Sequence, residues 1–164
     1  MKPEKCPGIP EDCHIKCSES IQQVMEKGCV VIDEDGEVLA EYGNKLCHNP
    51  REPGIGHAFL QWVTNHQGDP SKVLRISLTP EKNGSYRQFP RGYGIDSINK
   101  GDHKFIALAS ACSKVPVILQ ATDRKWWKYK KAFMKAGLDV CFLCPRFVKK
   151  KRGKKAPKKR KSRQ

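Results

Sequence analysis

Long apolar runs are missing from this sequence, and so is an apolar stretch of signal-peptide length in its opening MKPEKCPGIPEDC. A helix needs roughly 20 consecutive apolar residues to cross a bilayer, and no stretch of the chain approaches that length. These absences predict a soluble protein with no membrane partner. We expect it in the cytoplasm, with the nucleus as the alternative in a eukaryotic host.

Acidic residues are missing from the C-terminal end. Arg146 to Gln164 contains twelve Lys or Arg and no Asp or Glu, which leaves 20 basic against 17 acidic residues elsewhere in a chain of formal charge +15. After Val148 this stretch has almost no apolar residues with which to offset the entropy cost of folding. We therefore predict one domain at 1–145, long enough for a core of ordinary size, and a disordered basic tail at 146–164.

The tail predicts contact with polyanions, nucleic acid above all. Clustered cations release counterions from nucleic acid and bind it with little reading of base sequence. The alternatives are a solubilising segment, a nuclear-import signal or contact with anionic lipid. The predicted nucleic-acid-binding residues are Lys149, Lys150, Lys151, Arg152, Lys154, Lys155, Lys158, Lys159, Arg160 and Lys161.

Regular cysteine spacing, typical of a disulfide framework, is also missing. Several of the eight cysteines lie inside apolar segments such as GCVVI, ASACSK and DVCFLC, which predicts reduced, buried thiols. Structural zinc is the alternative, because two close cysteine pairs are the usual arrangement of its ligands. Its ligands would be Cys13, Cys17, Cys141 and Cys144, with His14 nearby. Against it, Cys141 and Cys144 would face opposite sides of a strand.

Short β-branched runs alternate with segments of helical period in the body of the chain. The predicted strands lie near 29–33, 116–122 and 140–144, with a further candidate at 73–78. The predicted helices lie at 18–27, 38–46, 55–66, 102–114 and 125–136, the last one stopped by Gly137. Because parallel strands need crossovers of this kind, the pattern predicts an α/β fold with a mostly parallel central sheet covered on both faces.

Four acidic residues stand where chemistry is expected. Asp33 and Asp123 follow predicted strands, and ligands of open α/β sheets bind beyond the carboxyl ends of the strands. Asp102 would lie on the buried side at the start of its helix, and Glu41 at the edge of an apolar stripe. Mg²⁺ or Mn²⁺ would compensate the repulsion of gathered carboxylates. Taken singly, each acid also suits a helix cap, a turn or a solvated position.

The order of these acids resembles that of the PIN-domain nucleases, particularly small prokaryotic PIN-like proteins. The matching stretches are VVIDEDGEVLAEYGNKL, PGIGHAFLQWV, GDHKFIALA and VILQATDRKWW, within roughly Pro10 to Pro145. The resemblance implies a three-layer α/β/α fold and an endoribonuclease that uses Mg²⁺ or Mn²⁺. It also implies that Glu41, Asp102 and Asp123 are the catalytic acids that ligate this metal.

The chain departs from the family pattern at two places. The family's first Asp ends an apolar opening strand, whereas IPEDC offers Glu11 or Asp12 as the fourth acid after a Pro-rich lead. A further acid often follows the position of Asp123, where this chain has Arg124 and Lys125. Two other functions therefore stay open, a non-catalytic nucleic-acid-binding module and a zinc-stabilised interaction protein.

Aromatic residues adjoin the predicted site. Trp126 and Trp127 directly follow Asp123, and because neighbours on a helix face different ways, we expect one in the core and the other available to stack on a base. A second mixture, which suits RNA contact or a solvated loop, comprises Arg75, Tyr86, Arg87, Phe89, Arg91 and Tyr93. RNA or another nucleic acid is the predicted partner. The resemblance adds a protein inhibitor of the toxin–antitoxin kind, and a homodimer stays open.

Overall fold

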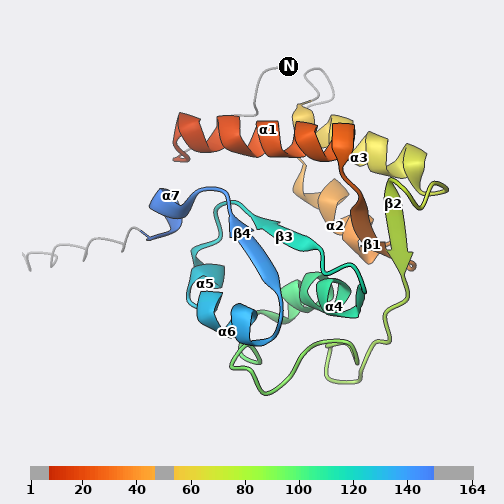
Figure 1. The fold of residues 1–164 in the computed structure, drawn as a ribbon, viewed down its shortest axis with the longest axis vertical. Coiled ribbons are helices and arrows are strands. Elements are labelled where there is room, and N and C mark those ends of the chain that lie inside the picture. Colours follow the sequence, from red (N-terminus) through yellow and green to blue (C-terminus); the bar gives the residue numbers. More distant parts are fainter. Residues whose placement is uncertain (1–7, 47–53, 150–164) are drawn as a thin grey trace, which may run out of the picture.

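The computed structural model describes residues 8–46 and 54–149, in which helices surround short strands (Figure 1). The helices are α1 (Glu11–Lys27), α2 (Glu37–Lys45), α3 (Ile55–His66), α4 (His103–Ala111), α5 (Arg124–Trp127), α6 (Lys130–Lys135) and α7 (Pro145–Lys149), and a single 3₁₀ turn, η1 (Lys100–Asp102), precedes α4. The strands are β1 (Val30–Asp33), β2 (Val73–Ile76), β3 (Val117–Gln120) and β4 (Asp139–Phe142).

The strands form two parallel pairs. β1 pairs with β2 and β3 pairs with β4, with Val30 opposite Val73 and Val117 opposite Asp139. α2 and α3 connect the first pair, and α5 and α6 connect the second, as parallel strands require. The prediction of a mixed α/β fold with parallel strands is thus confirmed. A single central sheet is not formed within residues 8–46 and 54–149, because β1 and β3 each bond to a strand on one edge only.

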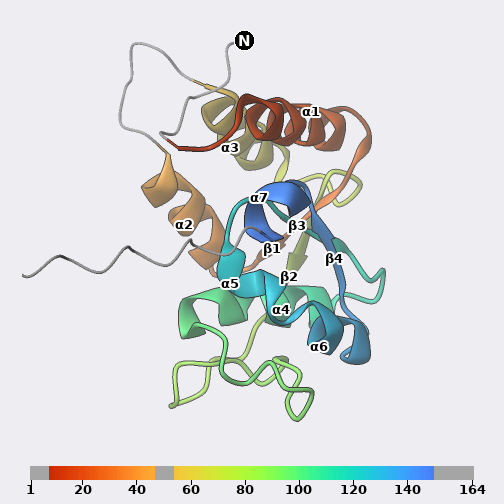
Figure 2. The ribbon, with the colours of Figure 1, turned by 90° about the vertical axis from the view of Figure 1, so that its left-hand side faces the viewer.

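Helix α4 holds the two strand pairs together. It contacts both β1 and β3, and Ile106, Ala107 and Leu108 on it are buried. Figures 1 and 2 show α1 and α3 side by side across the top of the strands, with α4 below them. Val117 and Leu119 of β3 remain 49% and 43% exposed. One face of β3 is therefore uncovered, in contrast to the sheet covered on both faces that the sequence predicts.

The irregular stretch between β2 and η1 supplies core residues that periodicity does not reveal. Its buried apolar side chains are Leu78, Tyr86, Phe89, Ile95 and Ile98. Phe89 stacks on the ring of His103 at 3.9 Å between centroids, and Nδ1 of that ring lies 2.8 Å from the Ser85 hydroxyl. Desolvation lowers the pKa of His103, so its ring is predominantly neutral at pH 7.

Two predicted helices differ from those observed. The helix expected from Ser18 begins at Glu11, with Pro10 as its N-cap residue, so Glu11 and Asp12 are helical. The helix expected over 125–136 is divided into α5 and α6. At the division the amide of Tyr129 donates to the carbonyl of Trp126, three residues back rather than four. Gly137 has a φ of 72° and follows Ala136, the C-cap residue of α6, which confirms its role as the helix stop.

Regular structure continues past Pro145, the expected end of the domain. α7 covers Pro145–Lys149, and Val148 within it is only 4% exposed. The remaining tail residues, 150–164, lie outside the described part of the chain. No helix among the described residues is long and apolar enough to span a bilayer.

Candidate functional site

Three predicted acids from distant parts of the sequence lie close enough to interact. Glu41 lies on α2, Asp102 ends the turn before α4, and Asp123 lies between β3 and α5. Burial raises the pKa of Asp102 most, and the charges of Asp123 and Glu41 raise it further. The three carboxylates do not form a tight ligand cluster, because no three acidic residues among those described have carboxylate oxygens within 4.8 Å of one another. We call Glu41, Asp102 and Asp123 the acidic site.

The side chain of Asp102 does not cap helix α4. Its side chain accepts no capping hydrogen bond from α4, although its position at the N-terminus of that helix would suit one. The indole N–H of Trp126 donates to it instead. Trp126 is only 2% exposed and packs against Phe133, so it belongs to the core. Its role as a donor to the site was not predicted from the sequence.

Glu41 has a basic partner that the sequence pattern did not reveal. Nζ of Lys104, on α4, lies 2.9 Å from a carboxylate oxygen of Glu41 and 3.9 Å from one of Glu37. Glu37 also accepts a hydrogen bond from the Tyr86 hydroxyl. An open depression of about 420 Å³ lies over this ion pair and is lined by Glu37, Ala40, Glu41, Asn44, Lys45 and Lys104.

Asp123 and Asp33 both act as helix caps, but with different consequences. Oδ1 of Asp123 accepts the amide of Lys125 at 2.7 Å, which leaves its second oxygen without a capping bond. Asp33 is 3% exposed and uses both oxygens, which accept the amides of Glu37 and Val38 at 2.7 and 2.8 Å. Asp33 is therefore structural, as the simpler interpretation of a turn-forming acid predicts.

Glu11 and Asp12 are not brought to the acidic site. Both lie in the first turn of α1 and are exposed. Neither is among the charges that shift the pKa of Asp102. Asp12 instead lines a pocket together with Cys13 and Cys144. The expected fourth acid is thus separate from the other three, since Glu11 and Asp12 begin a helix rather than end a strand.

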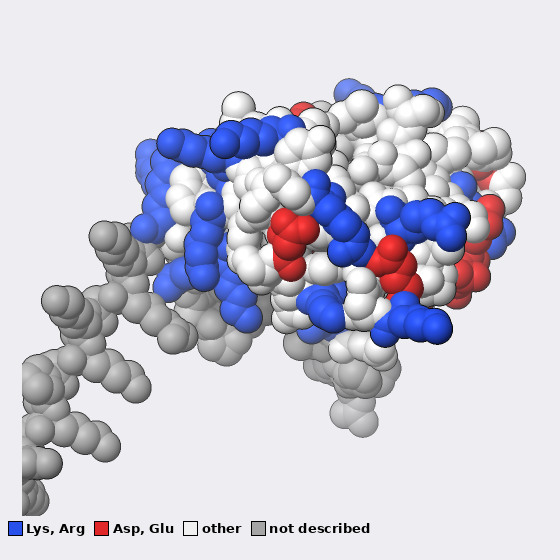
Figure 3. Space-filling view, turned by 90° about the horizontal axis from the view of Figure 1, so that it is seen from below, with Lys and Arg blue, Asp and Glu red and all other residues white. Residues whose placement is uncertain are grey.

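A basic surface follows the acidic site along the chain. Residues 124–135 contain six Lys or Arg and no acid, and none of the six forms an ion pair with a described acid. Seen from below, Lys and Arg side chains gather on the side of the molecule that carries α5 and α6 (Figure 3). We call these six side chains the α5–α6 basic surface. They are Arg124, Lys125, Lys128, Lys130, Lys131 and Lys135.

Trp127 lies on this surface. Its ring meets Phe142 edge-on at 4.8 Å between centroids and remains half-buried. Nζ of Lys130 and Nζ of Lys149 each lie 5.1 Å from the centre of the ring. The expectation of a core tryptophan is met by Trp126, whereas Trp127 is partly buried and its stacking on a base stays a prediction. Of the predicted tail cations only Lys149 is described, and Lys150 to Lys161 lie outside the described residues.

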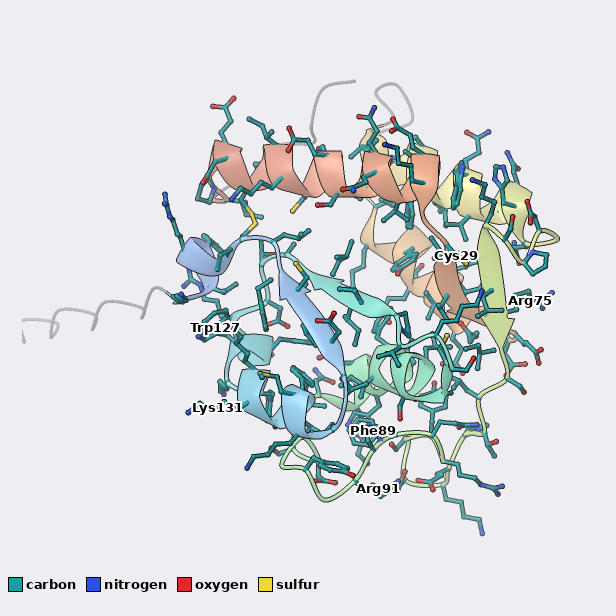
Figure 4. The ribbon with its side chains drawn as sticks, viewed as in Figure 1. Cys29, Arg75, Phe89, Arg91, Trp127 and Lys131 are labelled. Atoms are coloured by element: carbon teal, nitrogen blue, oxygen red, sulfur yellow. A yellow bond between two sulfur atoms is a disulfide. The ribbon has the colours of Figure 1, made fainter. Side chains whose placement is uncertain are left out.

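The mixture of arginines and aromatics in the middle of the chain does not form one surface. Tyr86 and Phe89 are buried in the core, whereas Tyr93 is 46% exposed. Figure 4 shows Arg75 beside β2 and Arg91 in the lower loop, both well separated from Trp127. Arg91 forms an ion pair with Glu81. The segment therefore supplies core side chains as well as exposed ones, and RNA contact by its exposed residues stays a prediction.

The cysteines correct the expectation of reduced thiols throughout. Cys13 and Cys144 form a disulfide, visible in Figure 4 between α1 and the segment that leads to α7. Sγ of Cys17 lies 4.0 Å from that of Cys144. Cys141 is exposed and lies outside this group, so the proposed set of four zinc ligands is not assembled. Burial raises the pKa of the Cys17 thiol.

Asp102→Asn should raise the free energy of unfolding at pH 7. A carboxyl with a raised folded-state pKa binds its proton more tightly in the folded state, so its contribution to stability falls as the pH rises from the unfolded pKa through the folded one. Asparagine removes this cost and still accepts the Trp126 N–H. We expect a gain of about 0.5 kcal/mol, because water screens this partly exposed site.

Urea unfolding at pH 7 and pH 4 checks this expectation, and the gain should shrink at the lower pH. The matched control is Asp139→Asn, which removes an exposed acid of β4 and should leave stability unchanged within about 0.5 kcal/mol. A loss of stability in Asp102→Asn at pH 7 would show instead that the carboxylate stabilises the fold.

Comparisons of the chain with protein-family models, with curated proteins and with solved structures found no match.

Proposed function

We propose that this protein is a divalent-metal-dependent endoribonuclease that hydrolyses phosphodiester bonds of single-stranded RNA. The observation that carries the proposal is the approach of Glu41, Asp102 and Asp123, which lie on separate elements and interact electrostatically. A raised carboxyl pKa at a partly exposed cluster of like charges is typical of functional sites. The resemblance to PIN-domain nucleases around the same three residues supports this assignment.

The donor set of the acidic site suits Mg²⁺ or Mn²⁺. Its three carboxylates offer hard oxygen ligands, and a cation would relieve the repulsion that contributes to the raised pKa of Asp102. We assign the cation to Glu41, Asp102 and Asp123. When bound, such a cation activates water and stabilises the charge that develops during phosphodiester cleavage. It would compete with Lys104 for the carboxylate of Glu41.

The α5–α6 basic surface is proposed to bind the RNA backbone beside the acidic site. Arg124 and Lys125 directly follow Asp123, so a phosphate near the acids also meets cations. Trp127 offers a partly exposed ring on which a base stacks. The tail residues Lys149 to Lys161 would add affinity without sequence preference. This activity belongs in the cytoplasm, or in the nucleus of a eukaryotic host, where a protein inhibitor would restrain it.

The proposal includes a three-layer α/β/α arrangement with a central parallel sheet. In such a sheet β1, β2, β3 and β4 would belong to one continuous set of paired strands. The unpaired edges of β1 and β3 and their shared contact with α4 support this arrangement. Two isolated pairs of four-residue strands are otherwise marginal as sheets.

A non-catalytic RNA-binding module is the second candidate function. The ion pair between Glu41 and Lys104 favours it, because an ammonium group already compensates one of the three acids. The cap bond of Asp123 also occupies one of its oxygens. In this case the α5–α6 basic surface would bind RNA while the acidic site holds no cation productively.

The test is cleavage of a mixed-sequence single-stranded RNA with Mn²⁺ or Mg²⁺ by the full chain. Asp102→Asn combined with Asp123→Asn should reduce cleavage about 100-fold or more, because it removes two of the three ligands. Asp139→Asn is the matched control and should retain full activity, and chelation should abolish cleavage. Circular dichroism establishes that each variant is folded, and fluorescence anisotropy measures RNA binding separately.

The outcomes separate the two candidates. Metal-dependent cleavage that the double substitution removes, with RNA binding retained, supports the nuclease. RNA binding by a folded wild-type protein without cleavage in either metal overturns it and supports the binding module. Cleavage that persists unchanged in the double variant overturns the assignment of the acidic site.

A further inference from the structure

Three cysteines from the two ends of the described chain gather at one point. Cys13 and Cys17 lie four positions apart on α1, which puts them on the same side of the helix. Cys144 directly precedes α7, 131 residues after Cys13. The three Sγ atoms all lie within 4.8 Å of one another. No other group of three ligand-bearing Cys, His, Asp or Glu residues in the described part of the chain is as close.

This cysteine group is largely buried and lies beside a pocket. Cys13 and Cys144 are 3% and 5% exposed, and Cys17 is partly buried. A pocket of about 400 Å³ opens beside them and is lined in part by Asp12, Lys16 and Phe147. The group is therefore shielded but reachable from solvent on one side, as a site that exchanges a small ion requires.

We propose that Cys13, Cys17 and Cys144, once the disulfide is reduced, bind one zinc ion as thiolates. The proposal does not rest on the nuclease function. Two sulfur ligands of tetrahedral zinc are separated by about 3.8 Å, because each Zn–S bond is about 2.3 Å. The 4.0 Å between Sγ of Cys17 and Sγ of Cys144 is close to that spacing. Reduction frees the Cys13 sulfur to move to a similar separation.

A thiol or phosphine reductant first gives two electrons to the disulfide, which takes up two protons and becomes two thiols while the reductant is oxidised. Binding then exchanges protons for the metal: three thiols release three protons and form three Zn–S bonds, with no further change of oxidation state. Water or a small ligand that enters from the pocket beside Cys13 and Cys144 would be the fourth ligand, since no fourth described side chain completes the group. The bound ion would join the start of α1 to the segment before α7. It would replace in reducing conditions the link that the disulfide makes in oxidising ones.

The site differs from the zinc site that sequence spacing suggests. Cys141 is exposed on β4 and does not join, although it forms a C-x2-C pair with Cys144. Cys13 and Cys17 of α1 supply two ligands, and Cys144, directly before α7, supplies the third. Cys141→Ser is therefore a control from the same segment that should leave binding unchanged.

The experiment uses the full chain, reduced with a phosphine, loaded with zinc sulfate and desalted. Elemental analysis should find about one zinc per chain in the wild type and in Cys141→Ser, and less than a tenth in Cys17→Ser. Cys17→Ser is the decisive variant because it removes one proposed ligand and keeps both cysteines of the disulfide, Cys13 and Cys144. Cobalt(II) in place of zinc should give the thiolate-to-metal absorption band in the wild type and lose it in Cys17→Ser.

Circular dichroism establishes that each variant is folded, and a zinc-dependent rise in Tm measures zinc binding independently of elemental analysis. The reduced wild type should melt at higher temperature with zinc than without it, and Cys17→Ser should show no such rise. Asp102→Asn combined with Asp123→Asn should bind zinc like the wild type, which separates this site from the acidic site. Failure of the folded, reduced wild type to retain zinc overturns the proposal. Equal loss of zinc in Cys141→Ser overturns the assignment of its ligands.

Discussion

Replacing Phe133 with alanine should lower the free energy of unfolding by about 3–5 kcal/mol, as large-to-small changes in a close-packed core do. Phe133 is 1% exposed and is among the largest fully buried side chains of the described chain. Its ring packs against Trp126 and Tyr129, with centroids 5.2 and 6.2 Å away. Truncation would remove these contacts and leave a cavity under α5, next to the indole that donates to Asp102.

Urea unfolding followed by tryptophan fluorescence measures this effect, because Trp126 reports on the same contact. Met134, the next residue of α6, provides the control, since it is 70% exposed. Met134→Ala should change the free energy of unfolding by no more than about 0.5 kcal/mol. A loss below about 1 kcal/mol in Phe133→Ala would show that α6 does not pack on the core as described.

The regular elements of the fold were largely predictable from the sequence, because buried strands and amphipathic helices leave a periodic pattern. β1, α3 and α4 begin or end within a few residues of their expected limits. The sheet was not predictable in the same way. Whether β1 and β3 are adjacent depends on long-range pairing, and apolar runs such as PVILQ look the same in a central strand and in an edge strand.

The acidic site shows a similar division. The grouping of Asp102 with Glu41 and Asp123 came from the resemblance to PIN-domain nucleases rather than from a local pattern, and the charges of the other two acids do raise the pKa of Asp102. Lys104 and the Trp126 donor were missed, because each acts through a side-chain direction that sequence spacing does not specify. Glu11 and Asp12 were assigned by analogy with a strand end, whereas the chain there forms the first turn of α1.

The cysteine group was half visible in the sequence. Because Cys13 and Cys17 are four residues apart, they lie on the same side of a helix only if α1 begins before Ser18. The acidic and polar composition of Glu11 to Lys16 does not indicate such an early start. Cys144 joins them because of how the chain end packs near α1, which no local pattern encodes. The C-x2-C spacing of Cys141 and Cys144 was easier to recognise, but it wrongly predicted the exposed Cys141 as a zinc ligand of this group.

Asp33→Ala should lower the free energy of unfolding by about 2–3 kcal/mol. The buried carboxylate accepts hydrogen bonds from the amides of Glu37 and Val38. A hydrogen bond to a charged group contributes about 1.5–3 kcal/mol to stability. Val38 is fully buried, so its amide would find no water in place of the lost oxygen. The loss would also remove a negative charge from the N-terminus of α2, where the helix dipole favours it.

Asp35→Ala is the control, because this neighbouring acid is exposed and makes no hydrogen bond to α2. Asp33→Asn keeps one acceptor oxygen and should cost about half as much as Asp33→Ala. Urea unfolding measures all three variants, and RNA cleavage measured on the folded fraction separates stability from activity. Under the proposed nuclease function, and if Asp33 only caps α2, folded Asp33→Asn should retain the cleavage that Asp102→Asn combined with Asp123→Asn loses. An equal loss of cleavage in both would instead assign Asp33 to the acidic site.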